Sequence, residues 1–145
     1  MRMGIALLAV GLFVVPGILG QSAEKPAPAS AITGVWRGDY DGLPGVVIVV
    51  TDEGDTLTGA VLFYFHTRED VNHPWKSSPG IPEPMLNPKF DGTTLTFQIS
   101  HRRAHPPGSL GDPPVSFHLK LIGPDKAEAQ NEREGPPLIA TRSDY

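Results

Sequence analysis

The chain has 145 residues, which is enough for one domain. Its 12 Lys and Arg stand against 16 Asp and Glu, and the net charge of −4 argues against the basic face of a nucleic-acid-binding protein. Cysteine is absent, so disulfides, thiol catalysis, thiolate zinc sites and lipid anchoring on cysteine are excluded. The 16 glycines and 16 prolines predict many turns and few long helices.

The N-terminal segment, residues 1–20, has the pattern of a secretory signal peptide. Arg2 gives a positive start, and residues 5–19 form an apolar run that is short for a membrane span of about 20 residues. We expect cleavage near Gly20 or Ala23; the alternative is an uncleaved anchor helix. Residues 21–31 are small, polar and proline-containing, which predicts a flexible tether before a folded domain at 32–145. The predicted location is secreted or periplasmic, with no stable transmembrane segment after processing.

Eight short strands are predicted in the folded domain. Apolar and polar residues alternate over 94–100 and over 115–121, which is typical of half-buried strands. The other predicted strands are 32–40, 46–51, 56–65, 85–90, 126–133 and 138–143. Because closure removes exposed strand edges, we predict an all-β fold, an eight-stranded antiparallel up-and-down barrel.

The connections between these strands fall into two groups. Tight turns are predicted at 52–55, 91–92 and 123–126, and in up-and-down order all three share one end of the barrel. Two long, proline-rich segments, 66–84 and 101–114, share the other end. Proline lowers the entropic cost of ordering a loop, so we expect shaped loops that cover an open end, where function usually resides.

Two short motifs suggest a family. Gly34-x-Trp36 opens the first predicted strand, and Leu57-Thr58-Gly59 lies in the third. This arrangement resembles the calycin barrels, both lipocalins and the avidin type. The resemblance implies structural roles for Gly34, Trp36 and Arg142: the tryptophan plugs the closed end, and a basic residue of the last strand lies across it, here as a cation–π contact. The tryptophans that contact the avidin ligand have no match, so biotin binding is not implied.

The candidate ligand-binding residues gather at the expected open end. They are Tyr40, His66, Trp75, His101, Arg102 and His105. Guanidinium groups and imidazoles together can hold a carboxylate or phosphate. Alternatively, Arg102 and Arg103 pair with Glu69, Asp70 or Asp112 and only fasten one loop to the other.

Metal binding and catalysis receive less support from the sequence. Histidines with nearby carboxylates can bind a metal ion, but the two adjacent arginines would repel a cation. Serine-hydrolase elbows, HExxH zinc motifs and phosphate-binding glycine loops are absent from the sequence. We therefore expect no cofactor, no metal and no catalytic residue.

The sequence thus predicts a secreted or periplasmic barrel that binds a small, partly apolar molecule with an anionic group. One alternative is a structural or interaction module with a filled barrel that contacts an envelope protein. A second is a small metal-dependent hydrolase, which needs His66, His101 and His105 close together. An apolar cavity would favour the ligand binder, and a filled barrel with an exposed apolar patch around Trp75 and Ile81 would favour the interaction module.

Overall fold

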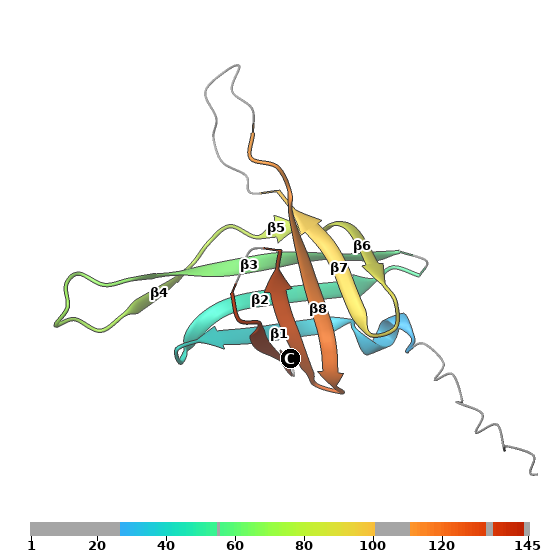
Figure 1. Cartoon of the computed structure of the whole chain (residues 1–145), viewed down its shortest axis with the longest axis horizontal. Coiled ribbons are helices and arrows are strands. Elements are labelled where there is room, and N and C mark those ends of the chain that lie inside the picture. Colours follow the sequence, from blue (N-terminus) through green and yellow to red (C-terminus); the bar gives the residue numbers. More distant parts are fainter. Residues whose placement is uncertain (1–26, 55, 101–110, 133–134, 144–145) are drawn as a thin grey trace, which may run out of the picture.

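The computed structural model describes residues 27–54, 56–100, 111–132 and 135–143. In these residues the chain is all-β and antiparallel, and its strands form one curled sheet (Figure 1). A single 3₁₀ turn, η1 (Ala29–Ala31), precedes the strands. Within this part of the chain, no helix is long and apolar enough to cross a membrane.

Ten strands make up the described sheet. They are β1 (Gly34–Tyr40), β2 (Leu43–Asp52), β3 (Leu57–Thr67), β4 (Lys76–Pro79), β5 (Glu83–Pro84), β6 (Leu86–Phe90), β7 (Thr94–Ile99), β8 (Val115–Gly123), β9 (Lys126–Asn131) and β10 (Leu138–Ser143). Their order is β4-β3-β2-β1-β10-β9-β8-β7-β6, and β5 pairs with β3 off this path. Each of the eight predicted strands overlaps an observed one, while β4 and β5 are additional.

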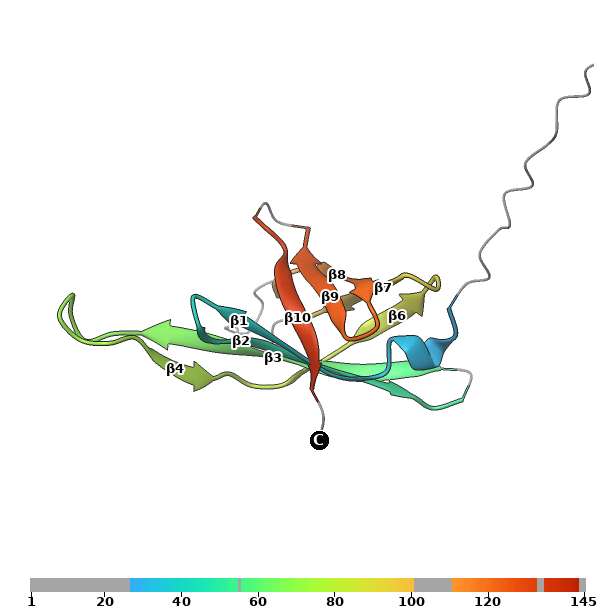
Figure 2. The ribbon, with the colours of Figure 1, turned by 90° about the horizontal axis from the view of Figure 1, so that it is seen from below.

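The two additional strands lie in the segment 66–84, where we expected an irregular covering loop. β4 runs back along the end of β3, with Phe65 opposite Ser78 and His66 opposite Ser77. Pro79 and Pro84 suggested a break in strand structure, but an edge strand tolerates proline because one side of its backbone needs no partner. The segment therefore extends the sheet as a long hairpin, seen at the left of Figures 1 and 2.

The tight turns follow from glycine and aspartate at the strand ends. Between β1 and β2, Asp41 and Gly42 have φ angles of 51° and 77°, the two successive positive values that a tight hairpin turn requires. Because consecutive strands are antiparallel, the β2–β3, β6–β7 and β8–β9 turns lie at one end of the sheet, which we call the turn end. The β1–β2 turn and the β3–β4 and β9–β10 connections lie at the other, the loop end.

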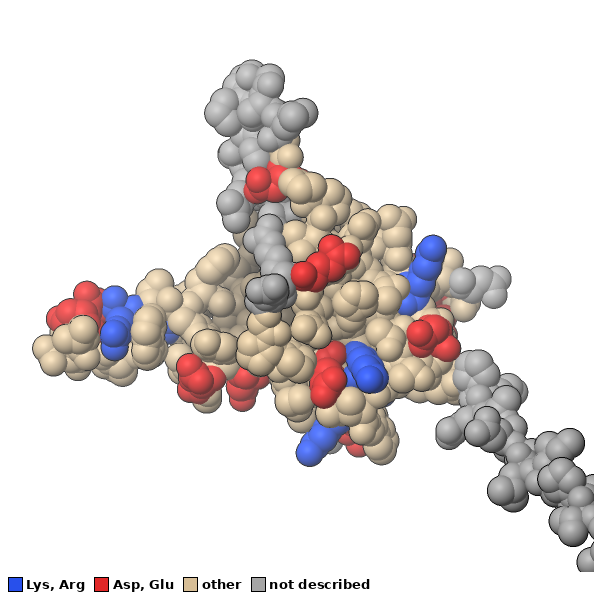
Figure 3. Space-filling model, in the orientation of Figure 1, with Lys and Arg blue, Asp and Glu red and all other residues tan. Residues whose placement is uncertain are grey.

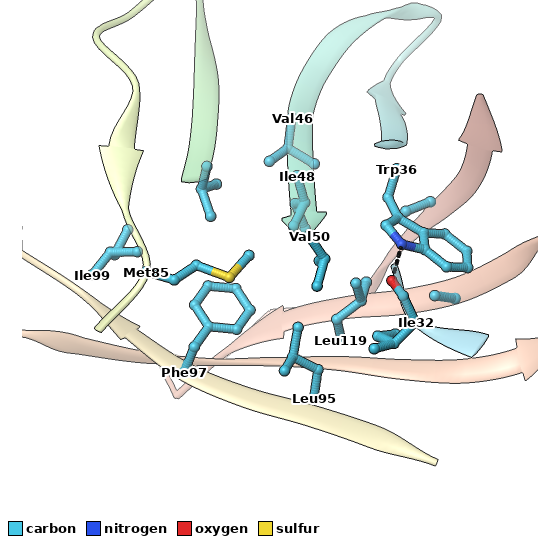
Figure 4. Packing of buried hydrophobic residues seen from close by; sticks show 13 residues of the cluster. Ile32, Trp36, Val46, Ile48, Val50, Met85, Leu95, Phe97, Ile99 and Leu119 are labelled. Atoms are coloured by element: carbon cyan, nitrogen blue, oxygen red, sulfur yellow. Dashed lines mark hydrogen bonds between the residues drawn. The ribbon is translucent and has the colours of Figure 1, made fainter. Parts of the chain in front are cut away.

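The core lies where the sheet curls and its two halves, β1–β3 and β6–β9, face each other (Figures 2 and 4). Inward residues alternate along each strand, as in Val46, Ile48 and Val50 of β2. The largest fully buried side chains are Trp36, Ile32, Leu95, Ile99, Leu119 and Val61. Figure 4 shows Ile32, Trp36, Leu119, Leu95 and Val50 packed together, so side chains fill this part of the fold.

Trp36 and Arg142 are in contact at the turn end of the sheet. The Trp36 indole N–H donates to the carbonyl of Ile32 at 2.9 Å, which satisfies its polar atom inside the core. The Arg142 guanidinium carbon lies 4.5 Å from the centroid of the Trp36 ring. The same guanidinium donates to the carbonyls of Ala31 and Thr33, so one side chain ties η1 and the start of β1 to β10.

Gly34 allows this arginine to approach the backbone. Its φ of +125° is a conformation that other residues rarely adopt, and a Cβ there would lie 3.2 Å from a terminal nitrogen of Arg142. A side chain at position 34 would thus both strain the backbone and press on the guanidinium.

Candidate functional site

A cavity of about 700 Å³ opens at the loop end of the sheet. It lies between the β1–β2 hairpin and β3 on one side and β8, β9 and the connection to β10 on the other. The interior of the curled sheet is therefore packed around Trp36 near the turn end, and this cavity opens at the loop end. A second hollow of about 550 Å³ lies at the turn end beside Arg142.

The floor of the cavity is apolar and aromatic. Val46, Ile48 and Val61 continue the inward rows of β2 and β3, and Phe63 and Phe117 face each other across the fold. The rings of Phe63 and Phe117 have centroids 5.7 Å apart, and Phe117 stacks on the buried Phe97 at 5.8 Å. These ring pairs separate the cavity from the filled core, so a ligand would meet only carbon at this depth.

The rim carries the polar groups. Tyr40 at the end of β1 is 59% exposed, and its ring centroid lies 6.1 Å from that of His66 on β3. The His66 Nε2 atom lies 2.8 Å from the carbonyl oxygen of Pro44, and the Ser77 hydroxyl donates to the same oxygen at 3.1 Å. These bonds hold the β1–β2 hairpin against β3 and β4.

The hydrogen bond of His66 also fixes its chemistry. A carbonyl oxygen can only accept, so Nε2 carries the proton. In the neutral imidazole the other nitrogen, Nδ1, is then an acceptor. His66 can thus accept one hydrogen bond from a bound molecule while it keeps its structural bond to Pro44.

The charge of the described rim is negative. Asp39 and Asp41 line the cavity on either side of Tyr40, and among the described lining residues there is no Lys or Arg. On the face in Figure 3, the lysines and arginines that the structure describes form no continuous patch. The described lining of the mouth therefore offers hydrogen-bond acceptors and aromatic ring faces.

The β3–β4 hairpin beyond Tyr64 projects from the body of the sheet, and we call residues 64–79 the arm (Figures 1 and 2). Trp75 near its tip is 51% exposed, with the Arg68 guanidinium carbon 4.7 Å from its ring centroid. Trp75 is not among the residues that line the cavity, whereas Tyr40 and His66 are.

The acidic residues of the arm tip are occupied by partners within the tip. Glu69 contacts the Lys76 ammonium at 2.7 Å, and Asp70 contacts His73 Nδ1 at 2.9 Å. The His73 hydrogen bond is the main cause that lowers the pKa of Asp70 below its ordinary value, because it favours the charged carboxylate. The tip therefore satisfies its own charges.

The remaining candidate residues, His101, Arg102 and His105, lie outside the described residues, so their relation to the cavity stays a prediction. In the described part of the chain, no group of three His, Asp or Glu is placed to hold a metal ion.

Aromatic residues in predicted strands are expected in the core, and Phe63 and Phe117 do pack against the core cluster. Together with Phe65, they also line the cavity. Strand alternation over 115–121 indicated that Phe117 points inward, and the structure places it across the fold from Phe63. Their position near the loop end of their strands was the signal that could have marked them as floor residues, because the core fills from the other end.

Comparisons of the chain with protein-family models, with curated proteins and with solved structures gave no match.

Proposed function

We propose that this protein binds a small, largely apolar molecule in the cavity at the loop end. The observation that carries the proposal is the combination of an aromatic floor with a polar rim in a volume of about 700 Å³. Binding pockets for small molecules typically have about 300–1,000 Å³, mostly apolar walls and a few polar groups that orient the ligand.

We also propose that the sheet closes into an eight-stranded barrel around this cavity. The support is the junction between β5 and β6: β5 pairs with β3, and the Met85 N–H donates to the Gly59 carbonyl at 2.9 Å. The chain continues directly into β6, which pairs with β7. A ring of β1, β2, β3, β5–β6, β7, β8, β9 and β10 is of the size that holds one small ligand.

A secreted or periplasmic location remains our proposal for where binding takes place. Its support is the apolar run at 5–19 and the tether-like composition of 21–31. The sequence also predicted an anionic group on the ligand. That prediction depends on His101, Arg102 and His105, which lie outside the described residues, and it stays the alternative to a cationic ligand.

The neutral dye N-phenyl-1-naphthylamine, whose fluorescence rises in apolar surroundings, tests the binding proposal. We expect saturable binding to the wild-type protein and at least about tenfold weaker binding to Ala129→Phe, which fills a cavity-lining position of β9. Thr141→Phe, on the exposed face of β10, is the matched control and should bind like wild type.

Circular dichroism and thermal melting of each variant show whether it is folded, so that weaker binding is read only from folded protein. The proposal fails if wild type does not bind, or if a folded Ala129→Phe variant binds as wild type does. Native mass spectrometry of protein purified from its natural host would then identify any retained ligand by mass.

The arm supports a second candidate function, that of a protein-interaction module. Large apolar side chains are exposed along it and just after it, with Phe65 at 63%, Val71 at 75%, Trp75 at 51% and Ile81 at 71%. Such a concentration on one projecting element is typical of contact surfaces.

Site-specific photo-crosslinking in cells tests this second function. A photo-reactive residue at position 75 should give an adduct of one discrete mass, whereas the same residue at Ile122, an exposed position on β8, should not. Identical adduct patterns from the two positions would count against an interaction through the arm.

A further inference from the structure

We infer that the ligand of the cavity carries a positive charge on an aromatic or otherwise flat apolar body. This inference rests on the proposed function and adds the chemical class of the ligand. It differs from the anionic ligand that the sequence predicts, because the described rim has the opposite charge.

The first support is the pair of carboxylates at the mouth. Asp39 and Asp41 line the cavity and are exposed, and the described residues place no ion-pair or hydrogen-bond partner on either side chain. Two aspartates that line one concave site give it a negative potential that attracts a cation. The net charge of −4 for the whole chain adds to this field.

The second support is the ring of Tyr40 between these carboxylates. Arginines cover the rings of Trp36 and Trp75, while among the described residues no Lys or Arg lies over Tyr40. An ammonium group in the cavity would therefore find an uncovered aromatic ring and two carboxylates among the lining residues. Carboxylates combined with an aromatic face are a common way for proteins to recognise ammonium ligands.

The third support is the floor beneath the rim. Phe63 and Phe117 are tilted by 42° to each other, and both rings line the cavity, so a flat ring can make an edge or face contact with them. The depth of the cavity thus suits an apolar ring, and the mouth suits a cation.

Three probes with one ring system and three charges test the inference. They are 2-naphthylmethylammonium, 2-naphthylmethanol and 2-naphthoate, with affinities measured by isothermal titration calorimetry at two salt concentrations. We expect the ammonium to bind about tenfold tighter than the alcohol, which corresponds to about 1.4 kcal/mol, and the carboxylate to bind weakest. The preference for the ammonium should decrease in high salt.

The variant Asp39→Asn/Asp41→Asn identifies the source of the preference. Asparagine keeps the size of aspartate and tolerates the positive φ at position 41, so the turn should persist. The double variant should lose the tenfold advantage of the ammonium and keep the affinity for the alcohol. Glu128→Gln, on a residue of β9 outside the cavity lining, removes one charge as a control and should change neither.

The outcomes separate the two proposals. If the alcohol or the carboxylate binds at least as tightly as the ammonium, the inference about charge is wrong and the proposed function stands. If the ammonium preference survives in Asp39→Asn/Asp41→Asn, the carboxylates do not select the ligand and the inference is also wrong. If none of the three probes and no neutral dye binds, the proposed function itself fails.

Discussion

Arg142 illustrates how much of the turn end depends on one side chain. It covers the Trp36 ring, donates to the carbonyls of Ala31 and Thr33, and lies 3.3 Å through Nε from the Asp125 carboxylate. A planar guanidinium can make these contacts together because its N–H groups point in fixed directions. Its contribution should therefore exceed that of a single surface ion pair.

We expect Arg142→Met to lower the free energy of unfolding by about 2–4 kcal/mol, because it removes a cation–π contact and charged hydrogen bonds to buried backbone. Arg142→Lys should restore less than half of this loss, since an ammonium cannot reach several carbonyls in the same geometry. The measurement is urea denaturation followed by tryptophan fluorescence.

Arg37→Met, on the exposed face of the same strand pair, is the matched control and should change stability by less than about 0.5 kcal/mol. Equal effects of the two methionine substitutions would contradict the role given to Arg142.

Asp91 controls the β6–β7 turn through its charge. Its carboxylate accepts hydrogen bonds from the N–H groups of Thr93 at 2.8 Å and Thr94 at 2.7 Å, and these bonds, that of Thr94 first, lower its pKa below the ordinary value. The folded protein therefore holds this proton less tightly than the unfolded chain does. The stability that Asp91 contributes is present above the unfolded pKa and is lost as the pH falls through the folded pKa.

Asp91→Asn should flatten the dependence of the melting temperature on pH in the acid range, from about pH 5 downward, because an amide does not titrate there. Asp41→Asn makes the same chemical change at an exposed turn without such bonds, and it is the matched control for the loss of one negative charge. If the melting temperature of Asp91→Asn depends on pH as that of the wild type does, the Asp91 turn does not contribute to acid sensitivity.

At the scale of elements, the junction between β3 and β5 decides whether the sheet has an open edge. Ala60 pairs with Pro84 and Val61 pairs with Glu83. Only these two residue pairs join β5 to β3. Because the chain contains no cysteine, an engineered pair of cysteines can test the pairing of β3 with β5 without competing thiols.

Ala60→Cys/Pro84→Cys should form a disulfide under mild oxidation, since directly opposed residues of antiparallel strands have Cα separations within the range a disulfide needs. We expect the oxidised protein to gain stability against urea relative to its reduced form. Thiols that remain free and reactive in the folded protein would show that β5 leaves β3 in solution.

Strand positions could be predicted from the sequence and the arm could not. Alternation such as Leu95, Phe97 and Ile99 reports directly which face is buried, so the strands of the body were within reach of pattern analysis. Lys76–Pro79 has no such alternation, since both its faces are largely solvated, and its pairing depends on β3 extending past the β1–β2 turn. That extension is a property of relative strand length, which local patterns do not encode.

The candidate site was predicted only in part for a similar reason. Tyr40 and His66 were expected at the loop end, and in the structure their ring centroids lie 6.1 Å apart. Phe63 and Phe117 could either line a cavity or fill the space between the two halves of the sheet. Which of these occurs depends on the distance between the two halves at the loop end. Inward orientation follows from alternation, but the distance between facing halves follows from the curl of the whole sheet.

At the scale of the whole molecule, the packed core around Trp36 and the cavity at the loop end separate stability from binding. Trp36, Leu95 and Leu119 supply packing at the turn end, and the cavity lies beyond Phe97. Substitutions at the rim should therefore alter affinity with little loss of stability. Tyr40→Ala, at a 59% exposed position, should weaken binding of the ammonium probe while the melting temperature stays within a few degrees of wild type.

The pairing of β1 with β10 also affects when the protein can complete its fold. Trp36 stands opposite Arg142, so the centre of the sheet joins residues from the two ends of the domain. During synthesis one edge of β1 has no partner strand, and Trp36 lacks its contact with Arg142, until the ribosome has made β10. Contacts of such long range also slow folding, because the intervening chain must be ordered first. We therefore expect the nascent chain to complete its fold only after β10 has been synthesised.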